Sequence, residues 1–248
     1  MGHILKLRYV LLIFLTFQVN AEAIRIGLIE AKPWAYYDEA GLIAGVYPSV
    51  FKKIQQDTGV NLELKLYPFA RVKNELRRER GLVDLSIFSF KKKRTLYFKQ
   101  IIPLFEMDFV ILSHKNSTIN TIEDIQGKQI GLIAGGSGCP CIDGITYNKV
   151  YLSDHKYGLR MLANRRIDGQ AGPSIRLIQA MHDIDYKEPY KAIVYEKRQV
   201  WLWARKNLMD ESDGVLKIKE YMQDYFSKNS HLKLLEQEFG SGWDRFIR

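Results

Sequence analysis

Two cysteines separated by a single residue are the most reactive side chains of the sequence. They form the triplet Cys139-Pro140-Cys141, which follows the run Gly135-Gly136-Ser137-Gly138. A disulfide across so short a ring would be strained and more easily reduced than an ordinary structural bridge. Two inert thiols are the main alternative. A zinc site normally takes four ligands, and no other Cys or His stands nearby, so a redox or metal role ranks last and we expect no metal site.

The histidines and serines do not form the patterns that catalysis requires. Five histidines are present, and none belongs to a triad-like or metal-spaced cluster. Neither a Gly-x-Ser-x-Gly elbow nor a His-Glu-x-x-His helix occurs. Enzyme chemistry needs a placed acid or base, and only Glu30 and Asp38 are candidates near the cleft expected below. We therefore expect no enzyme and no cofactor.

The N-terminus has the anatomy of a secretory signal peptide. Lys6 and Arg8 precede the apolar run 9–15, which gives way to a small-residue site ending at Ala21. The run is too short for the roughly 20 residues of a membrane span. We expect cleavage after Ala21, with Ala23 as the alternative, and a periplasmic location. No Cys stands at either new N-terminus, which argues against a lipid anchor.

The exported chain is basic. Removing residues 1–21 leaves 35 basic and 28 acidic side chains, a net charge of about +7. Such a balance suits an anionic ligand, an acidic partner or an anionic membrane surface. For an exported chain without a DNA-reading motif, nucleic acid is not an expected partner. A solvated, soluble surface is the plain explanation.

Strands and helices alternate twice along the exported chain, which favours βαβ units and parallel sheets. In the first half the apolar periodicity predicts strands at 24–29, 61–66 and 83–88, and helices beginning near Val46 and spanning 69–80. In the second half it predicts a short helix at 121–125, strands at 128–133, 167–171, 192–194 and 199–204, helices at 155–164 and 174–182, and a long C-terminal helix. We infer an α/β fold of two lobes, joined by extended segments near 108–114 and 195–204.

This order of elements resembles the extracellular solute-binding proteins of family 3, the periplasmic receptors of polar amino-acid uptake systems. The resemblance covers nearly the whole exported chain. It rests on segments that occur in the family's order: 24–29, Pro33-Trp34-Ala35-Tyr36-Tyr37, Gly41 and Gly45, Gly81-Leu82-Val83-Asp84, Lys93-Arg94 with Tyr97-Phe98, 109–112, 122–131 and Arg166-Ile167-Asp168-Gly169.

The resemblance implies a type II periplasmic-binding-protein fold. Each lobe is then a mostly parallel sheet flanked by helices, and the lobes close like a hinge around a small solute. We expect lobe 1 at 22–110, lobe 2 at 111–198, and a return to lobe 1 with C-terminal helices at 199–248. The implied function is capture of a solute, expected to be anionic or to carry a carboxylate, and its delivery to an ABC-type permease by a monomer. Docking on a membrane sensor receptor and, behind it, a dehydratase-like enzyme are the alternatives.

The resemblance also assigns a ligand site. The arginine at the position of Arg94 clamps a ligand carboxylate in the family, and a guanidinium fork suits a planar anion. Arg71, in the first turn of its helix, is a second cationic candidate. Of Trp34, Tyr36 and Tyr37, we expect Trp34 or Tyr37 to stack on the ligand. The remaining ligand-binding candidates are Phe88 and Ser89 at the end of a strand and Ser137 in the Gly-rich turn.

One departure from the family bears on the ligand. Amino-acid receptors carry an acidic residue about five positions after the equivalent of Asp168, where it holds the ligand's ammonium group. This chain has Gly172-Pro173-Ser174 there. Because an ammonium group without an acidic partner is poorly compensated in a closed cleft, a standard α-amino acid is not the expected ligand. Asp84 and Asp168 themselves are expected to be turn or capping carboxylates.

Overall fold

The structure is a computed structural model that describes residues 23–134, 144–208 and 212–240. The predicted signal peptide, Ser137 and both cysteines lie outside the described residues. In the part of the chain that is described, no helix has the length and apolar character needed to cross a bilayer.

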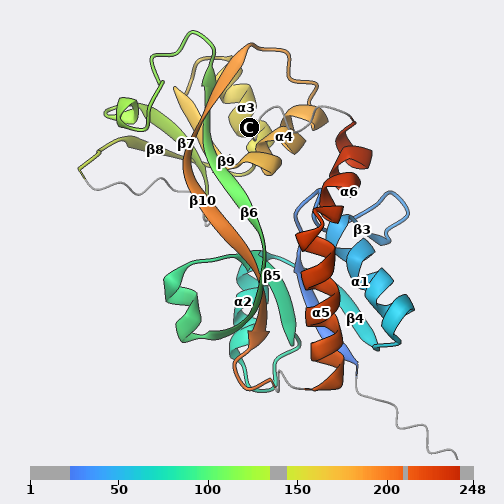
Figure 1. The fold of residues 1–248 in the computed structure, drawn as a ribbon. Helices are drawn as coiled ribbons and strands as arrows, with labels where there is room; N and C mark the ends of the chain where they lie inside the picture. Colours follow the sequence, from blue (N-terminus) through green and yellow to red (C-terminus); the bar gives the residue numbers. More distant parts are fainter. Residues whose placement is uncertain (1–22, 135–143, 209–211, 241–248) are drawn as a thin grey trace, which may run out of the picture.

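Figure 1 shows two lobes connected by a pair of long strands. The lower lobe, lobe 1, contains β1 (Ile24–Ile29), β2 (Tyr36–Tyr37), β3 (Ile43–Ala44), α1 (Val46–Thr58), β4 (Leu62–Tyr67), α2 (Phe69–Arg77), β5 (Leu85–Ser89), the 3-10 helix η1 (Lys92–Leu96), α5 (Asp213–Ser227) and α6 (Ser230–Phe239). Lobe 2 contains the 3-10 turn η2 (Glu123–Ile125), β7 (Gln129–Ile133), β8 (Asn148–Leu152), α3 (His155–Ala163), β9 (Gly169–Pro173) and α4 (Ser174–Asp183). The connecting strands are β6 (Phe98–His114) and β10 (Tyr190–Arg205).

One eight-stranded sheet runs through both lobes, in the order β4-β1-β5-β10-β6-β9-β7-β8. Three strands at each end are parallel to one another, β4-β1-β5 in lobe 1 and β9-β7-β8 in lobe 2. The two connecting strands are antiparallel to each other and to the strands they flank. The α/β fold with mostly parallel sheets and flanking helices is therefore as predicted.

The elements follow from local sequence where the apolar pattern is regular. The stripe Val46, Val50, Phe51 and Ile54 on α1 is buried, and the helix ends at Gly59, whose φ of 70° is accessible without strain to glycine. Residues 24–29 form β1 as predicted.

The connecting strands are longer than predicted. β6 has 17 residues and β10 has 16, whereas the sequence pattern predicted shorter extended pieces. Their pairing contains register shifts, one of them between Val200 and Trp201, where Pro103 lies opposite Trp201. Such bulges interrupt the alternation of buried and exposed residues. One long strand therefore has the sequence pattern of two short strands. The predicted crossings at 108–114 and 195–204 fall inside these strands.

Two further elements differ from the expectations. The predicted helix at 121–125 is the single 3-10 turn η2, and the exposed edge strand β8 was not predicted. The predicted long C-terminal helix is α5, and the shorter α6 follows it after Asn229, which takes a left-handed conformation with φ 53°.

The apolar core is divided between the lobes, with one exception. Lobe 1 holds one large cluster between its sheet, α1 and α5 and a smaller one around Trp203, while lobe 2 holds two clusters on either side of its sheet. Ile175, on α4 of lobe 2, belongs to the large cluster of lobe 1. The N-terminal turn of α4 is thus packed against the opposite lobe.

Candidate functional site

A cavity of about 340 Å³ lies between the lobes. Lobe 1 contributes the ends of β1 and β5, the loop after β1, and the first residue of α2. Lobe 2 contributes the end of β7, the N-terminus of α3, and the β9–α4 junction. The lining residues that matter below are Glu30, Trp34, Tyr47, Phe69, Phe88, Ser89, Phe109, Asp154, His155, Gly172, Pro173 and Arg176.

Aromatic rings form much of the lobe 1 wall. Trp34 is stacked between Tyr47 and Phe105, with ring centroids 5.0 Å and 5.1 Å away. Phe88 is stacked on the fully buried Trp203 at 5.2 Å, and the Trp203 Nε1–H donates to the backbone carbonyl of Phe88 at 2.9 Å. Because each ring is fixed by another ring, these walls are rigid and apolar, and the apolar part of a ligand can pack against them.

Arg176 is the arginine on the cavity wall. It lies in the first turn of α4, and its Nη1 donates to the backbone carbonyl of Lys32 in lobe 1. Within the described residues it forms no ion pair with a carboxylate. Burial lowers its pKa from the ordinary value, with the nearby Asp183 acting against that shift. A buried guanidinium whose donors are mostly unused favours an anion in the cavity.

The N-terminus of α3 brings two titratable groups to the lobe 2 wall. Asp154 caps this helix, since its Oδ1 accepts from the backbone N–H of Tyr157 at 2.8 Å, and this hydrogen bond lowers its pKa. The Nδ1 atom of His155 lies 3.0 Å from the Nε2 atom of the Gln170 side chain. Burial, and behind it the charge of Arg176, lowers the pKa of His155 to about 3, so the ring is neutral at pH 7.

The carboxylates on the cavity wall come from positions that the sequence did not indicate for a ligand ammonium group. The position of Gly172 and Pro173 does line the cavity without a carboxylate, as read from the sequence, but Glu30 and Asp154 line it from other elements. Glu30 follows β1 directly, and Asp154 follows β8. The cavity therefore has both positive and negative side chains with which a charged ligand can interact. The side chains present do not exclude an α-amino acid.

The structure places Arg94 behind the wall of the cavity. Its guanidinium lies 5.1 Å from the centroid of Phe88 and 5.2 Å from that of Phe69, both of which line the cavity. Its Nη1 donates to the backbone carbonyl and the hydroxyl of Ser89. Burial, followed by the charge of Arg198, lowers its pKa to about 10.

The remaining predicted site residues are divided. Trp34, Phe88 and Ser89 line the cavity together. Tyr37, in β2, is 50% exposed and is not part of the cavity lining. Arg71 is also exposed and outside the lining, and its guanidinium lies 4.8 Å from the centroid of the Tyr67 ring. Ser137 lies outside the described residues.

Asp84 and Asp168 bind backbone N–H groups, as expected of turn and capping carboxylates. Asp84 accepts from the N–H of Arg25 at 3.0 Å and pairs with the side chains of Arg25 and Arg205. Asp168 accepts from the N–H of Gln129 at 2.8 Å. In the described residues no group of three or more His, Cys, Asp or Glu side chains is placed to hold a metal ion.

Sequence reasoning missed Arg176, Asp154 and His155. The available signal was positional: Asp154 immediately precedes a predicted helix, and Arg176 lies in the first turn of another, where helices of α/β proteins face their ligands. Nothing in the local pattern distinguishes these residues from ordinary caps and surface charges.

Comparison with solved structures agrees with this architecture. An ancestral arginine-binding protein bound to arginine is 20% identical, with a TM-score of 0.69 over 88% of this chain and 98% of that one. The GluR0 ligand-binding core in complex with L-glutamate gives a TM-score of 0.73 at 13% identity, over 89% and 100% of the two chains. A histidine kinase sensor domain with similarity to periplasmic binding proteins gives 0.68 at 16% identity, over 88% and 96%.

No family model matches the sequence, and no curated protein matches it either. The structural matches therefore establish the fold. This chain has the two-lobed α/β fold of the periplasmic binding proteins, and its cavity lies between the lobes.

Proposed function

We propose that this protein binds a small carboxylate-bearing solute in the cavity between its lobes. The observation that carries the proposal is the Arg176 guanidinium, which lines an otherwise largely apolar cavity and has no carboxylate partner among the described residues. A ligand carboxylate would supply the missing counter-charge. The proteins of similar fold whose ligands are named, arginine and L-glutamate, hold small carboxylate-bearing molecules.

The walls define the rest of the ligand. Trp34, Phe69, Phe88 and Phe109 line the cavity with apolar surface, so the solute has an apolar or aromatic body. Glu30 and Asp154 can accept from a cationic or donor group at its other end. Ser89, held by Arg94, adds a polar group on the lobe 1 side, and Arg94 contributes a second positive charge one layer behind it.

Binding is proposed to proceed by hinge closure. The two strands β6 and β10 are the chain segments that run through both lobes in Figure 1, and their register shifts are places where an antiparallel pair bends readily. A ligand that contacts both walls favours the closed form by its differential affinity for that form. Arg176, which reaches from α4 to Lys32, would join the lobes when they are closed.

We further propose that the protein is exported, works as a monomer in the periplasm and delivers its solute to an ABC-type permease. A role in sensing is the second candidate, because a histidine kinase sensor domain has a similar fold. The two are separated by deleting the gene: loss of uptake of the labelled ligand supports transport, and loss of a ligand-induced transcriptional response with uptake intact supports sensing.

A thermal-shift screen tests the binding function. The purified protein is heated with α-amino acids, dicarboxylates and aromatic carboxylic acids, each beside its amide or ester analogue that lacks the carboxylate. We expect a rise in melting temperature with at least one carboxylate and no rise with its neutral analogue. A response to the neutral analogue equal to that of the acid would refute the assigned anion site.

A further inference from the structure

The surface formed by α2, η1 and the end of β10 carries positive charge that the protein does not neutralise. We name this surface the η1 face. Its basic side chains without an ion pair to any described residue are Lys73, Arg77, Lys92, Lys93 and Lys206.

Contacts between side chains show that these segments adjoin. The Arg77 guanidinium lies 4.4 Å from the centroid of the Tyr97 ring, which joins α2 to the residue after η1. The Lys206 Nζ donates to the backbone carbonyl of Leu96 at 3.1 Å, which joins η1 to the residues after β10. The charges of Arg94 and Arg77 contribute to lowering the pKa of Lys73, after its own desolvation, so like charges are crowded here.

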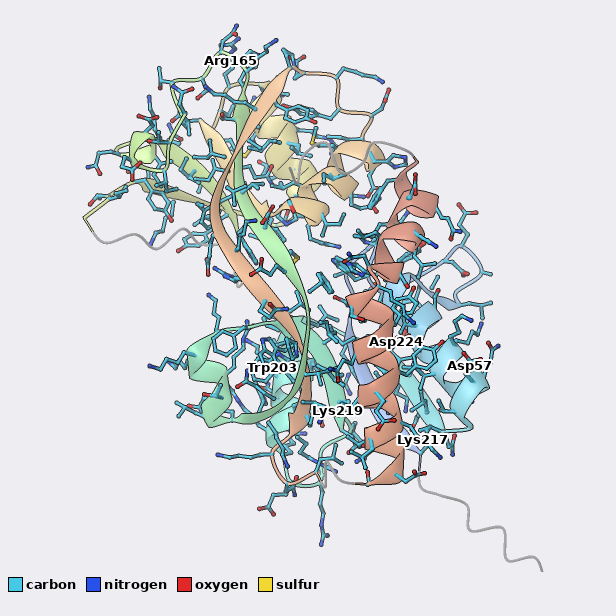
Figure 2. All side chains as sticks on the ribbon, viewed as in Figure 1. Asp57, Arg165, Trp203, Lys217, Lys219 and Asp224 are labelled. Carbon is cyan, nitrogen blue, oxygen red and sulfur yellow. The ribbon has the colours of Figure 1, made fainter. Side chains whose placement is uncertain are left out.

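Several exposed lysines elsewhere on the protein have acidic partners. The exposed ion pairs include Lys53–Asp57, Lys65–Glu63, Lys187–Asp185, Lys217–Asp213 and Lys228–Asp224. Figure 2 shows Asp57, Asp224, Lys217 and Lys219 on the α1–α5 side of lobe 1, whereas η1 projects on the other side of the sheet in Figure 1. The cations of the η1 face are therefore available to an external anion, whereas these paired lysines are already neutralised.

Apolar side chains stand among these cations. Leu96, whose carbonyl accepts from Lys206, is 63% exposed, and Tyr97, which contacts Arg77, is 42% exposed. Aliphatic and tyrosine side chains surrounded by lysine and arginine suit a membrane interface, where the apolar tips enter the headgroup region and the cations meet lipid phosphates. An acidic protein surface would satisfy the cations but would leave Leu96 without an apolar environment.

We propose that the η1 face docks on an anionic phospholipid surface. Docking would hold the binding protein at the membrane, where a permease or a sensor receptor lies, while leaving the cavity between the lobes free. The inference does not depend on which solute the cavity takes.

Vesicle co-sedimentation with the full chain tests this proposal. The measured quantity is the excess of binding to vesicles of phosphatidylglycerol mixed with phosphatidylcholine over binding to phosphatidylcholine alone. The N-terminal apolar segment is common to all variants and so does not affect the contrast between them. We expect a clear excess for the unaltered protein, and its loss at high salt.

Two triple variants with the same change of charge give the decisive comparison. Lys92→Glu, Lys93→Glu and Lys206→Glu alter the η1 face, and Lys217→Glu, Lys219→Glu and Lys228→Glu alter the α5 side. A basic side chain near an anionic surface contributes about fivefold to partitioning, so the first variant should lose about a hundredfold and the second much less. Leu96→Ser should weaken binding without changing the charge. Equal losses of vesicle binding in the two triple variants would overturn the proposal, as would the absence of excess binding by the unaltered protein. Thermal unfolding confirms that each variant is folded.

Discussion

The guanidinium of Arg176 on α4 donates a hydrogen bond to the backbone carbonyl of Lys32, 144 positions earlier in the chain. This bond joins lobe 2 to the loop after β1 at the wall of the cavity. Ile175, beside it, is buried in the large apolar cluster of lobe 1. A ligand anion bound by Arg176 would therefore be held by the residue that also links the two lobes, which couples ligand binding to closure.

Replacing Arg176 should abolish the strongest anion contact in the cavity. We expect Arg176→Met to weaken binding of the carboxylate identified by the thermal-shift screen by about thirtyfold or more, since a hydrogen bond to a charged group contributes about 1.5–3 kcal/mol. The free energy of unfolding should change little, because a buried cation without a carboxylate partner is replaced by an apolar side chain of similar length. Titration calorimetry measures the affinity. Arg160→Met, on the exposed side of α3, is the matched control, and an unchanged affinity for Arg176→Met would remove this residue from the site.

Arg94 provides the complementary test. The family resemblance makes Arg94 the carboxylate clamp, whereas in this structure it supports Ser89 from behind the cavity wall. We expect Arg94→Met to reduce the affinity by less than about tenfold, because a positioning contact rather than a ligand contact is lost. The same calorimetric titration decides between the two assignments: a larger loss for Arg94→Met than for Arg176→Met would restore the clamp role to Arg94.

Trp203 should be the most important single side chain for the stability of lobe 1. It is fully buried, stacks on Phe88 and donates a hydrogen bond to its carbonyl. We expect Trp203→Ala to lower the free energy of unfolding by about 4 kcal/mol, since truncation leaves a large cavity and an unpaired carbonyl. Urea denaturation followed by circular dichroism measures the change. The half-buried Trp201, replaced in the same way, should lose clearly less, and equal losses would contradict the assigned role.

Asp84 holds two arginines from separate strands. It pairs with Arg25 of β1 at 2.8 Å and with Arg205 of β10 at 2.7 Å, and its side chain is 7% exposed. Asp84→Asn removes the buried counter-charge that the two guanidinium groups share, so we expect a loss of about 3 kcal/mol in the free energy of unfolding. Asp168→Asn, at an exposed carboxylate that also accepts a backbone N–H, should lose about 1 kcal/mol or less. A loss at Asp84 no greater than at Asp168 would show that the pairs add nothing.

Acidification should destabilise the protein partly through His231. This ring is 3% exposed between Phe105 and Phe226, with both centroids 4.9 Å away, and burial lowers its pKa to about 4. Its ordinary pKa is 6.5, so between pH 6.5 and 4 the unfolded chain binds the proton more strongly. The contribution of His231 is complete above pH 6.5, and the free energy of unfolding falls by up to about 1.4 kcal/mol per pH unit below it.

His231→Phe should therefore reduce the fall in the free energy of unfolding on acidification. Urea denaturation at pH 7 and pH 5 measures the difference between the two pH values for the variant and for the unaltered protein. The exposed His182, replaced by Phe, should leave the decline as it was. If His231→Phe shows the same loss between pH 7 and pH 5 as the unaltered protein, the buried ring is not the cause.

Regular apolar patterns made part of the fold predictable. The stripe on α1 and the alternation in β1 are local, so neighbouring residues are enough to specify them. β6 and β10 were predicted only in pieces, because their bulges place consecutive residues on unexpected faces. β8 was missed because it is an exposed edge strand, whose side chains lack the buried alternation that marks a strand.

The candidate site was predictable only where its residues follow strand ends in lobe 1. Trp34, Phe88 and Ser89 could be placed from their own segment. Arg176 could not, because its significance comes from contact with Lys32 in the other lobe, and no pattern around residue 176 contains that information. Arg94 was correctly placed after β5, but whether its guanidinium faces the cavity or supports its wall depends on the packing of Phe69 and Phe88.

The sequence by itself determined two α/β halves, an excess of basic side chains and the order of the elements, since these depend on composition and short-range periodicity. Only the tertiary structure decided which charges face the cavity and which cations of the surface lack partners. The reason is physical: a charge acts on whatever lies within a few ångströms of it, and in a two-lobed fold those neighbours come from segments more than a hundred residues apart.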